Sequence, residues 1–206
     1  NLRLKNFRNY KELNVEFPTG LIVFSGKNAQ GKSNILEAMY CLAITKSPRA
    51  QNDREMINYE ALKDGMFSEI EATVERQDGP MTLHITLSGN LLQSNQDDSN
   101  ISRTKKHIRI NGIPHLASRA IGKVNAVLFS PDDIEVILGS PASRRRYLDI
   151  LLSQLSNEYL QSLQAYHRIL SQRNHLLRSI KENRSSPEEL DFWDRELCKT
   201  GAFILG

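Results

Sequence analysis

An eight-residue glycine-rich segment, Gly26 to Ser33, constrains this chain more than any other part of it. The segment reads GKNAQGKS, which fits the phosphate-loop pattern of a glycine, four residues of any type and then Gly-Lys-Ser/Thr. Such a match requires a buried strand before it and a helix after it. The apolar residues 21–24 (LIVF) precede the segment, and residues 32–44, which contain neither glycine nor proline, follow it. The sequence therefore predicts a strand, a phosphate loop and a helix, in that order.

The residue types in this segment explain how it would hold a nucleoside triphosphate. Gly26 and Gly31 let the backbone bend so that successive N–H groups point at one anion. The Lys32 ammonium would reach the β- and γ-phosphates, and the Ser33 hydroxyl would coordinate Mg²⁺. The helix that follows would direct the positive end of its dipole at the same anion. The predicted nucleotide ligands are Gly26, Lys27, Asn28, Ala29, Gln30, Gly31, Lys32 and Ser33, with Ser33 also the metal ligand.

Charge and cysteine content exclude several classes of protein. The chain carries 27 Lys and Arg against 24 Asp and Glu, and this net charge of +3 does not by itself indicate nucleic-acid binding. Cys41 and Cys198 stand far apart without a CxxC pattern, which argues against a zinc site or a disulfide framework. No apolar run approaches the roughly 20 residues that span a bilayer, and no signal-peptide pattern opens the chain. We therefore expect a cytoplasmic protein.

Alternation of apolar and polar residues, which is typical of half-buried strands, dominates the first 130 residues. The polar turn 77–80 joins two strands into a hairpin, and Asn111-Gly112 is a strong hairpin signal. Residues 89–104, rich in Asn, Gln, Ser and Asp, are interpreted as a mobile insertion. A weak helix is expected at 53–57. The predicted strands are 2–6, 13–17, 21–24, 69–76, 81–88, 105–110 and 125–129.

The second part of the chain is predicted to be helical. Ser130-Pro131 combines an N-cap with a proline at the first helical position. From Pro141 onward, apolar residues recur at three- and four-residue steps, with an interruption at Ser156-Asn157. Ser186-Pro187 begins a further helix with a capping box, so two antiparallel helices are expected. The predicted domains are an α/β lobe at 1–130 and the start of a helical lobe at 131–206. Since the chain opens at Asn1 within an alternating pattern and ends within an apolar one, we expect the N-terminal portion of a longer protein.

The order of the elements narrows the class of phosphate-loop protein. Kinases and GTPases usually place the loop after the first strand, whereas here a meander leads into it and antiparallel pairs follow. Segments 4–10 (LKNFRNY) and 26–43 (GKNAQGKSNILEAMYCLA) resemble the SMC-like ATPases of DNA recombination and repair, and within that group the RecF family. Segments 127–133 (VLFSPDD), 139–149 (GSPASRRRYLD) and 193–201 extend the resemblance over most of the chain, apart from 89–104.

This resemblance implies an α/β fold, namely the ABC-type phosphate-loop ATPase head with an antiparallel β-subdomain, followed by part of a helical lobe. It implies an ATP-dependent protein that binds duplex DNA and gap junctions in replication and recombinational repair and promotes recombinase loading. ATP and Mg²⁺ would be its cofactors, and RecR- and RecO-type proteins its partners. Two heads would dimerise around ATP. Arg8 would reach the nucleotide; a salt bridge at the strand end is the alternative explanation for Arg8.

ABC-type heads hydrolyse ATP with a Ser-rich signature motif and an apolar strand that ends in Asp-Glu, and this sequence contains neither. Asp132-Asp133 follow the apolar run 125–129, but Pro131 places them in a helix instead of at a strand tip. We therefore expect the catalytic acid beyond Gly206, weak DNA-dependent ATPase activity in the full-length dimer, and no turnover by this chain alone. A small-molecule kinase or a transport ATPase is the alternative, although the sequence contains no general-base and acceptor constellation to support it.

Basic residues supply candidates for contact with the DNA phosphate backbone, which binds clustered Lys and Arg. An Arg triplet, 144–146, occupies the first turn of a predicted helix, where the helix dipole disfavours cations. An anionic partner would explain that placement, and so would a solvated face or internal ion pairs. The candidate DNA-binding residues are Lys46, Arg49, Lys105, Lys106, Arg144, Arg145 and Arg146.

Overall fold

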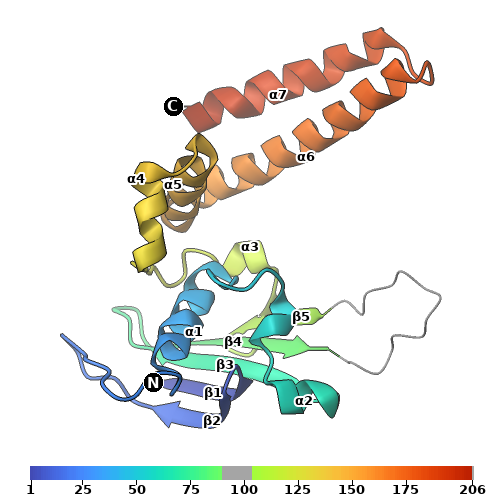
Figure 1. The fold of residues 1–206 in the computed structure, drawn as a ribbon. Coiled ribbons are helices and arrows are strands. Elements are labelled where there is room, and N and C mark those ends of the chain that lie inside the picture. Colours follow the sequence, from blue (N-terminus) through green and yellow to red (C-terminus); the bar gives the residue numbers. More distant parts are fainter. Residues whose placement is uncertain (90–103, 206) are drawn as a thin grey trace. The chain divides into compact units, whose positions relative to one another are not determined.

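The computed structural model describes residues 1–89 and 104–205. The chain divides into two compact units, Asn1–Ser130 and Pro131–Gly206 (Figure 1). The first contains a β-sheet with helices against it, and the second is helical. The insertion predicted at 89–104 lies, except for its two end residues, outside the described residues.

The first unit is built on one antiparallel sheet with the strand order β2-β1-β3-β4-β5-β6. The predicted central hairpin is confirmed, since β3 and β4 pair along their whole lengths. The turn at Asn111-Gly112 is confirmed as well, with φ angles of 50° and 79° that suit these residue types. The strands are β1 (Leu2–Phe7), β2 (Tyr10–Val15), β3 (Phe67–Val74), β4 (Met81–Ser88), β5 (Lys105–Ile110) and β6 (Ile113–His115).

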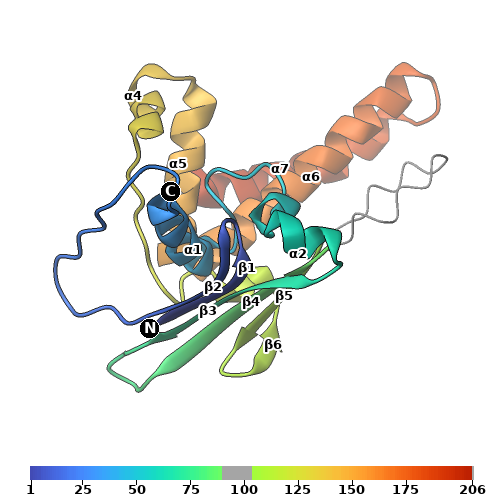
Figure 2. The same cartoon turned by 60° about the horizontal axis from the view of Figure 1, so that its bottom comes forward.

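One face of this sheet carries the hydrophobic core. Leu4, Ile70, Ile85 and Ile108 lie in register across four strands, and each is at most 4% exposed. Strand side chains alternate between the two faces, so the period of two in the sequence places all four on the same side. Helices α1 (Lys32–Ile44) and α2 (Tyr59–Lys63) cover that side, as Figure 2 shows. The register is therefore set by the burial of this apolar face.

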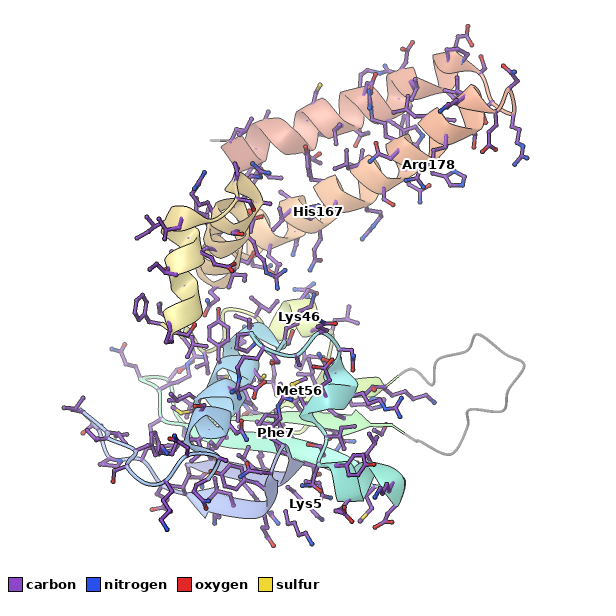
Figure 3. The ribbon with its side chains drawn as sticks, in the orientation of Figure 1. Lys5, Phe7, Lys46, Met56, His167 and Arg178 are labelled. Atoms are coloured by element: carbon purple, nitrogen blue, oxygen red, sulfur yellow. The ribbon has the colours of Figure 1, made fainter. Side chains whose placement is uncertain are left out.

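Phe7, the last residue of β1, is fully buried in this core and precedes the turn between β1 and β2. Its neighbour Arg8 donates its backbone N–H to the carbonyl of Met56, at 2.8 Å. Met56 closes the short helix η1 (Asp53–Met56), which confirms the predicted helical segment near 53–57. Figure 3 shows Phe7 and Met56 on the helix side of the sheet, and Lys5 on the opposite side.

Two predicted strands, 21–24 and 125–129, are wrong for this structure. Neither belongs to the six-stranded sheet, and neither is a strand among the described residues. In both segments half-buried residues alternate with exposed ones, and Leu21, Val23, Val127 and Phe129 are 93%, 76%, 73% and 86% exposed. A strand needs a ladder of hydrogen bonds with a neighbouring strand as well as an apolar pattern. The pattern is present in both segments, but the described residues place no sheet ladder beside either of them.

The second unit consists of helices whose boundaries follow local capping signals. Ser156 ends α5 and caps α6 by accepting a hydrogen bond from the Tyr159 N–H at 3.1 Å, which confirms the predicted interruption. Ser186 and Glu189 form the predicted capping box before α7. Helices α6 and α7 pack as a hairpin (Figure 1). The elements are η2 (Pro131–Ile134), α4 (Glu135–Leu138), α5 (Pro141–Leu155), α6 (Asn157–Lys181), η3 (Pro187–Glu189) and α7 (Leu190–Leu205); the remaining helix of the first unit is α3 (Ala117–Ala120).

The start of η2 at Pro131 agrees with the expectation that Asp132-Asp133 lie in a helix and not at a strand tip. No helix in the part of the chain that the structure describes is long and apolar enough to cross a membrane, and this includes the 25-residue α6.

Candidate nucleotide-binding site

The segment 26–33 adopts a loop that ends at the first turn of α1. Three of its residues have positive φ: Gly26 at 139°, Ala29 at 62° and Gly31 at 99°. Gly31 is the N-cap of α1, and its carbonyl accepts the N–H of Asn34 at 2.8 Å. Residues 26–30 are exposed, so their backbone groups are open to a ligand. The predicted helix of 32–44 is confirmed to the residue, and its N-terminus carries the positive end of the helix dipole.

Lys32 bends back over this loop. Its ammonium donates to the carbonyl of Gly26 at 2.7 Å and to the carbonyl of Lys27 at 2.6 Å. These two bonds hold the cation at the mouth of the loop, where an anion would meet it. The side chain of Ser33 is exposed in the first turn of α1. The residues thus suit a triphosphate with a metal ion, because they offer exposed backbone amides, the Lys32 ammonium and the accessible Ser33 hydroxyl.

Among the described residues, no three or more His, Cys, Asp or Glu side chains are arranged to hold a metal ion by themselves. Mg²⁺ in nucleotide sites is commonly held through substrate phosphates and very few protein groups. Ser33 therefore stays the predicted protein ligand for such an ion.

A buried carboxylate on α1 lies behind the loop and was not predicted from the sequence. Glu37 is 1% exposed and accepts four hydrogen bonds. Arg8 donates Nε to Oε2 at 3.0 Å and Nη2 to Oε1 at 2.6 Å, while the Ser47 hydroxyl bonds Oε1 and Arg49 Nη2 bonds Oε2. Arg8 therefore forms a salt bridge, which was the alternative explanation for this residue, and its partner is Glu37. The only signal in the sequence was an acidic residue within the apolar stripe of the helix.

Burial alone would raise the pKa of the Glu37 carboxyl, but the hydrogen bonds from Arg8, Ser47 and Arg49, with the charge of Arg8, hold that pKa below its usual value. A carboxyl whose pKa is lower in the folded than in the unfolded chain stabilises the fold above its unfolded pKa. That contribution is lost as the pH falls through the folded pKa.

We therefore expect the free energy of unfolding of the wild-type chain to exceed that of Glu37→Gln at neutral pH. The difference should shrink below about pH 4, near the ordinary pKa of glutamate. Urea unfolding of both proteins from about pH 7 to about pH 3 measures it. If the free energies of unfolding of the two proteins changed with pH in parallel, the ionised, paired state of Glu37 would be contradicted.

A network of side chains connects this buried carboxylate to the loop. Arg49 Nη2 also donates to Asn34 Oδ1 at 2.7 Å, and Asn34 Nδ2 donates to Asn9 Oδ1 at 2.7 Å. The Asn9 oxygen lies only 2.7 Å from the position that a Cβ on Gly31 would occupy. An open pocket of about 600 Å³ is formed here, lined by Arg8, Asn9, Asn34, Arg49, Glu55, Ile57 and Tyr59.

Four of the predicted DNA-binding residues belong to the first unit, and the structure gives them different surroundings. Lys46 (labelled in Figure 3) and Lys105 are exposed. Arg49 is 46% exposed, but it is drawn into the network behind the phosphate loop. The side chain of Lys106 is 16% exposed and bonds Asp53 at 2.7 Å, together with a backbone carbonyl. An ammonium neutralised in this way is less available to a DNA phosphate than an exposed one.

The Arg triplet lies in the second unit, at the start of α5, and all three side chains are exposed. Arg144 Nη1 lies within 3.2 Å of the Gly139 carbonyl and 3.4 Å of the Ile137 carbonyl, at the C-terminal end of α4. Cations stabilise the last carbonyls of a helix. An internal role therefore accounts for the position of Arg144, whereas Arg145 and Arg146 stay DNA-binding predictions without a described contact to explain them.

Comparison with known proteins identifies the class. The AAA domain family matches residues 1–197. The DNA replication and repair protein RecF of Chloroflexus aurantiacus is 40% identical in an alignment of 213 residues, gaps included. This alignment covers 99% of this chain and 53% of the relative. The RecF of Herpetosiphon aurantiacus is 42% identical over 211 residues, 99% of this chain and 54% of the relative. The chain thus spans about half the length of these curated relatives.

Two solved structures of RecF superpose on nearly all of the chain. The structure of the recombination mediator protein RecF-ATP in the RecFOR pathway matches with a TM-score of 0.85 and 32% identity, over 99% of this chain and 51% of that one. The RecF-ATPrS structure matches with a TM-score of 0.80 and 30% identity. The predicted phosphate-loop ATPase fold and the predicted resemblance to RecF are confirmed. With its glycine-rich loop at the start of α1, the chain belongs to the AAA domain family.

Proposed function

We propose that this chain binds ATP with Mg²⁺ at residues 26–33 and forms the ATP-binding part of a DNA-repair ATPase of the RecF type. One observation carries the proposal: the loop leads into α1 with open amides and the Lys32 ammonium at its mouth, in a chain that matches a RecF-ATP structure over 99% of its length. The loop amides and the dipole of α1 would hold the phosphates. Lys32 would exchange its two carbonyl partners for phosphate oxygens, and Ser33 would contact the metal ion.

The proposed role of the nucleotide is to bring two copies of the full-length protein together. In this arrangement the loop of one copy and a signature motif of the other enclose the same ATP. Hydrolysis would need an acid that this chain does not supply, so we propose that the chain alone binds ATP without turning it over. DNA gaps and RecR- and RecO-type proteins would be the partners of the closed dimer, since the RecF-ATP structure is described as part of the RecFOR pathway.

ATP should strengthen DNA binding by the full-length protein. We expect binding to a gapped duplex at low salt to tighten at least about tenfold when ATP and Mg²⁺ are added, because dimerisation doubles the number of basic contacts. Affinity should fall steeply as salt is raised, since phosphate contacts release counterions. Fluorescence anisotropy with a labelled gapped duplex measures both effects. Equal binding with and without ATP at low salt would contradict the repair function.

Exposed cations are the proposed DNA contacts. In the same assay, Arg145→Ala/Arg146→Ala in the second unit should weaken DNA binding without changing ATP affinity. Replacement of Lys181, a basic residue at the end of α6, by Ala serves as a control for the loss of an exposed charge elsewhere. A small-molecule kinase or a transport ATPase is the other candidate, and it would be favoured if ATP affinity were intact and no DNA binding were detected.

A further inference from the structure

The guanidinium groups of Arg8 and Arg49 meet at one carboxylate, although the two residues come from different segments of the chain. Arg8 lies in the turn between β1 and β2, and Arg49 follows α1. Glu37, between them on α1, uses both of its oxygens and accepts four hydrogen bonds from Arg8, Ser47 and Arg49. The carboxylate therefore has little freedom to turn. Two like charges can approach each other here because a buried anion lies between them.

Stability by itself is a weak explanation for this cluster. Glu37 lies on the buried face of α1, among apolar residues such as Ala38 and Cys41. Buried ion pairs are often no more stabilising than apolar residues of the same volume, because desolvation offsets the attraction between the charges. An apolar residue at position 37 would complete the stripe without that cost. What a carboxylate adds is a defined position for each guanidinium.

Arg8 and Arg49 both line the pocket that adjoins the phosphate loop. Arg8 Nη1 donates to the Glu55 carbonyl at 2.7 Å. Arg49 reaches Asn34, which is the residue after the predicted metal ligand Ser33. Glu37 thus connects the β1–β2 turn, the first turns of α1 and the segment after α1 into one rigid wall beside the loop.

We propose that Glu37 is a positioning residue for nucleotide binding, whose carboxylate holds the guanidinium groups of Arg8 and Arg49 in place beside the phosphate loop. The proposal rests on the proposed function, because it takes the nucleotide to lie against these two side chains. Arg49 then acts at the nucleotide site and not at a DNA surface. Glu37 itself touches no ligand and acts only through the two arginines.

A double-mutant cycle in the full-length protein tests this role. Dissociation constants for ATP with Mg²⁺ are measured by titration calorimetry for the wild type, Glu37→Gln, Arg49→Ala and the double mutant. We expect Glu37→Gln to weaken binding about tenfold in the wild-type background and by clearly less when Arg49 is already alanine. Glu60→Gln, which removes an exposed carboxylate on α2, should leave ATP affinity unchanged. Equal losses from Glu37→Gln in both backgrounds, or no loss, would overturn the positioning role.

Two further variants keep the outcomes distinct. If Glu37→Gln does not fold, Glu37→Asp replaces it in the same cycle, because the shorter side chain keeps the charge but cannot reach both guanidinium groups. Lys32→Ala reports on the proposed function itself. Loss of ATP binding in Lys32→Ala together with unchanged binding in Glu37→Gln overturns only the role of Glu37. Unchanged binding in Lys32→Ala overturns the proposed nucleotide site.

Discussion

Lys32→Ala is expected to weaken ATP binding by the full-length protein about 10- to 150-fold, since a hydrogen bond to a charged group contributes about 1.5–3 kcal/mol. The Lys32 ammonium bonds the Gly26 and Lys27 carbonyls and so lies at the phosphate loop. Titration calorimetry with ATP and Mg²⁺ measures the change. Because both carbonyl bonds are exposed, the melting temperature should fall by no more than a few degrees.

Lys11→Ala is the matched control for Lys32→Ala. It removes the same side chain from an exposed position of β2, outside residues 26–33, so ATP affinity should equal that of the wild type. The nucleotide site at 26–33 would be refuted by a Lys32→Ala protein that is folded and binds ATP as tightly as the Lys11→Ala protein does.

Gly31→Ala should damage both the fold around the loop and the binding of ATP. Gly31 has a φ of 99°, which side-chain-bearing residues rarely adopt, so alanine is strained there. In addition, its Cβ would lie 2.6 Å from the Tyr10 hydroxyl oxygen and 2.7 Å from Asn9 Oδ1. Relief of these contacts must move the Tyr10 and Asn9 side chains, the β1–β2 turn or the start of α1. We expect ATP binding to weaken at least about tenfold, as phosphate-binding amides leave their positions.

Gly79→Ala separates the strain from the steric conflict. Gly79, in the turn between β3 and β4, has a similar φ of 109°, but a Cβ there meets nothing within 4 Å. Its loss of stability should therefore reflect backbone strain alone, about 1–2 kcal/mol. Thermal unfolding of the two variants should show a larger drop for Gly31→Ala, and only Gly31→Ala should lose ATP affinity. Equal melting temperatures and equal ATP affinities would mean that the Tyr10 and Asn9 side chains move aside at no cost.

Most of the correct predictions rest on patterns among residues that are close together in the sequence. The phosphate loop, the helix 32–44, the Asn111-Gly112 turn and the capping at Ser156 all depend on residues within a few positions of one another. Period-two alternation likewise predicted which faces of β3 and β4 are buried, because a strand's two faces are set by its own backbone. Resemblance to the RecF family added the class of ATPase, which no local signal specifies.

Which segments and which charged groups lie next to each other was decided by the tertiary structure. The runs 21–24 and 125–129 have strand-like alternation, yet whether they join a sheet depends on which segments lie beside them. The sequence predicts Lys106 as a DNA contact, and only the fold shows that its ammonium pairs with Asp53. Glu37 was one acid in an apolar stripe, and only folding brings Arg8 and Arg49 to it. The sequence thus determined the chemistry of the loop, whereas long-range packing decided which charged groups support it, because ion-pair partners distant in sequence leave no periodic pattern.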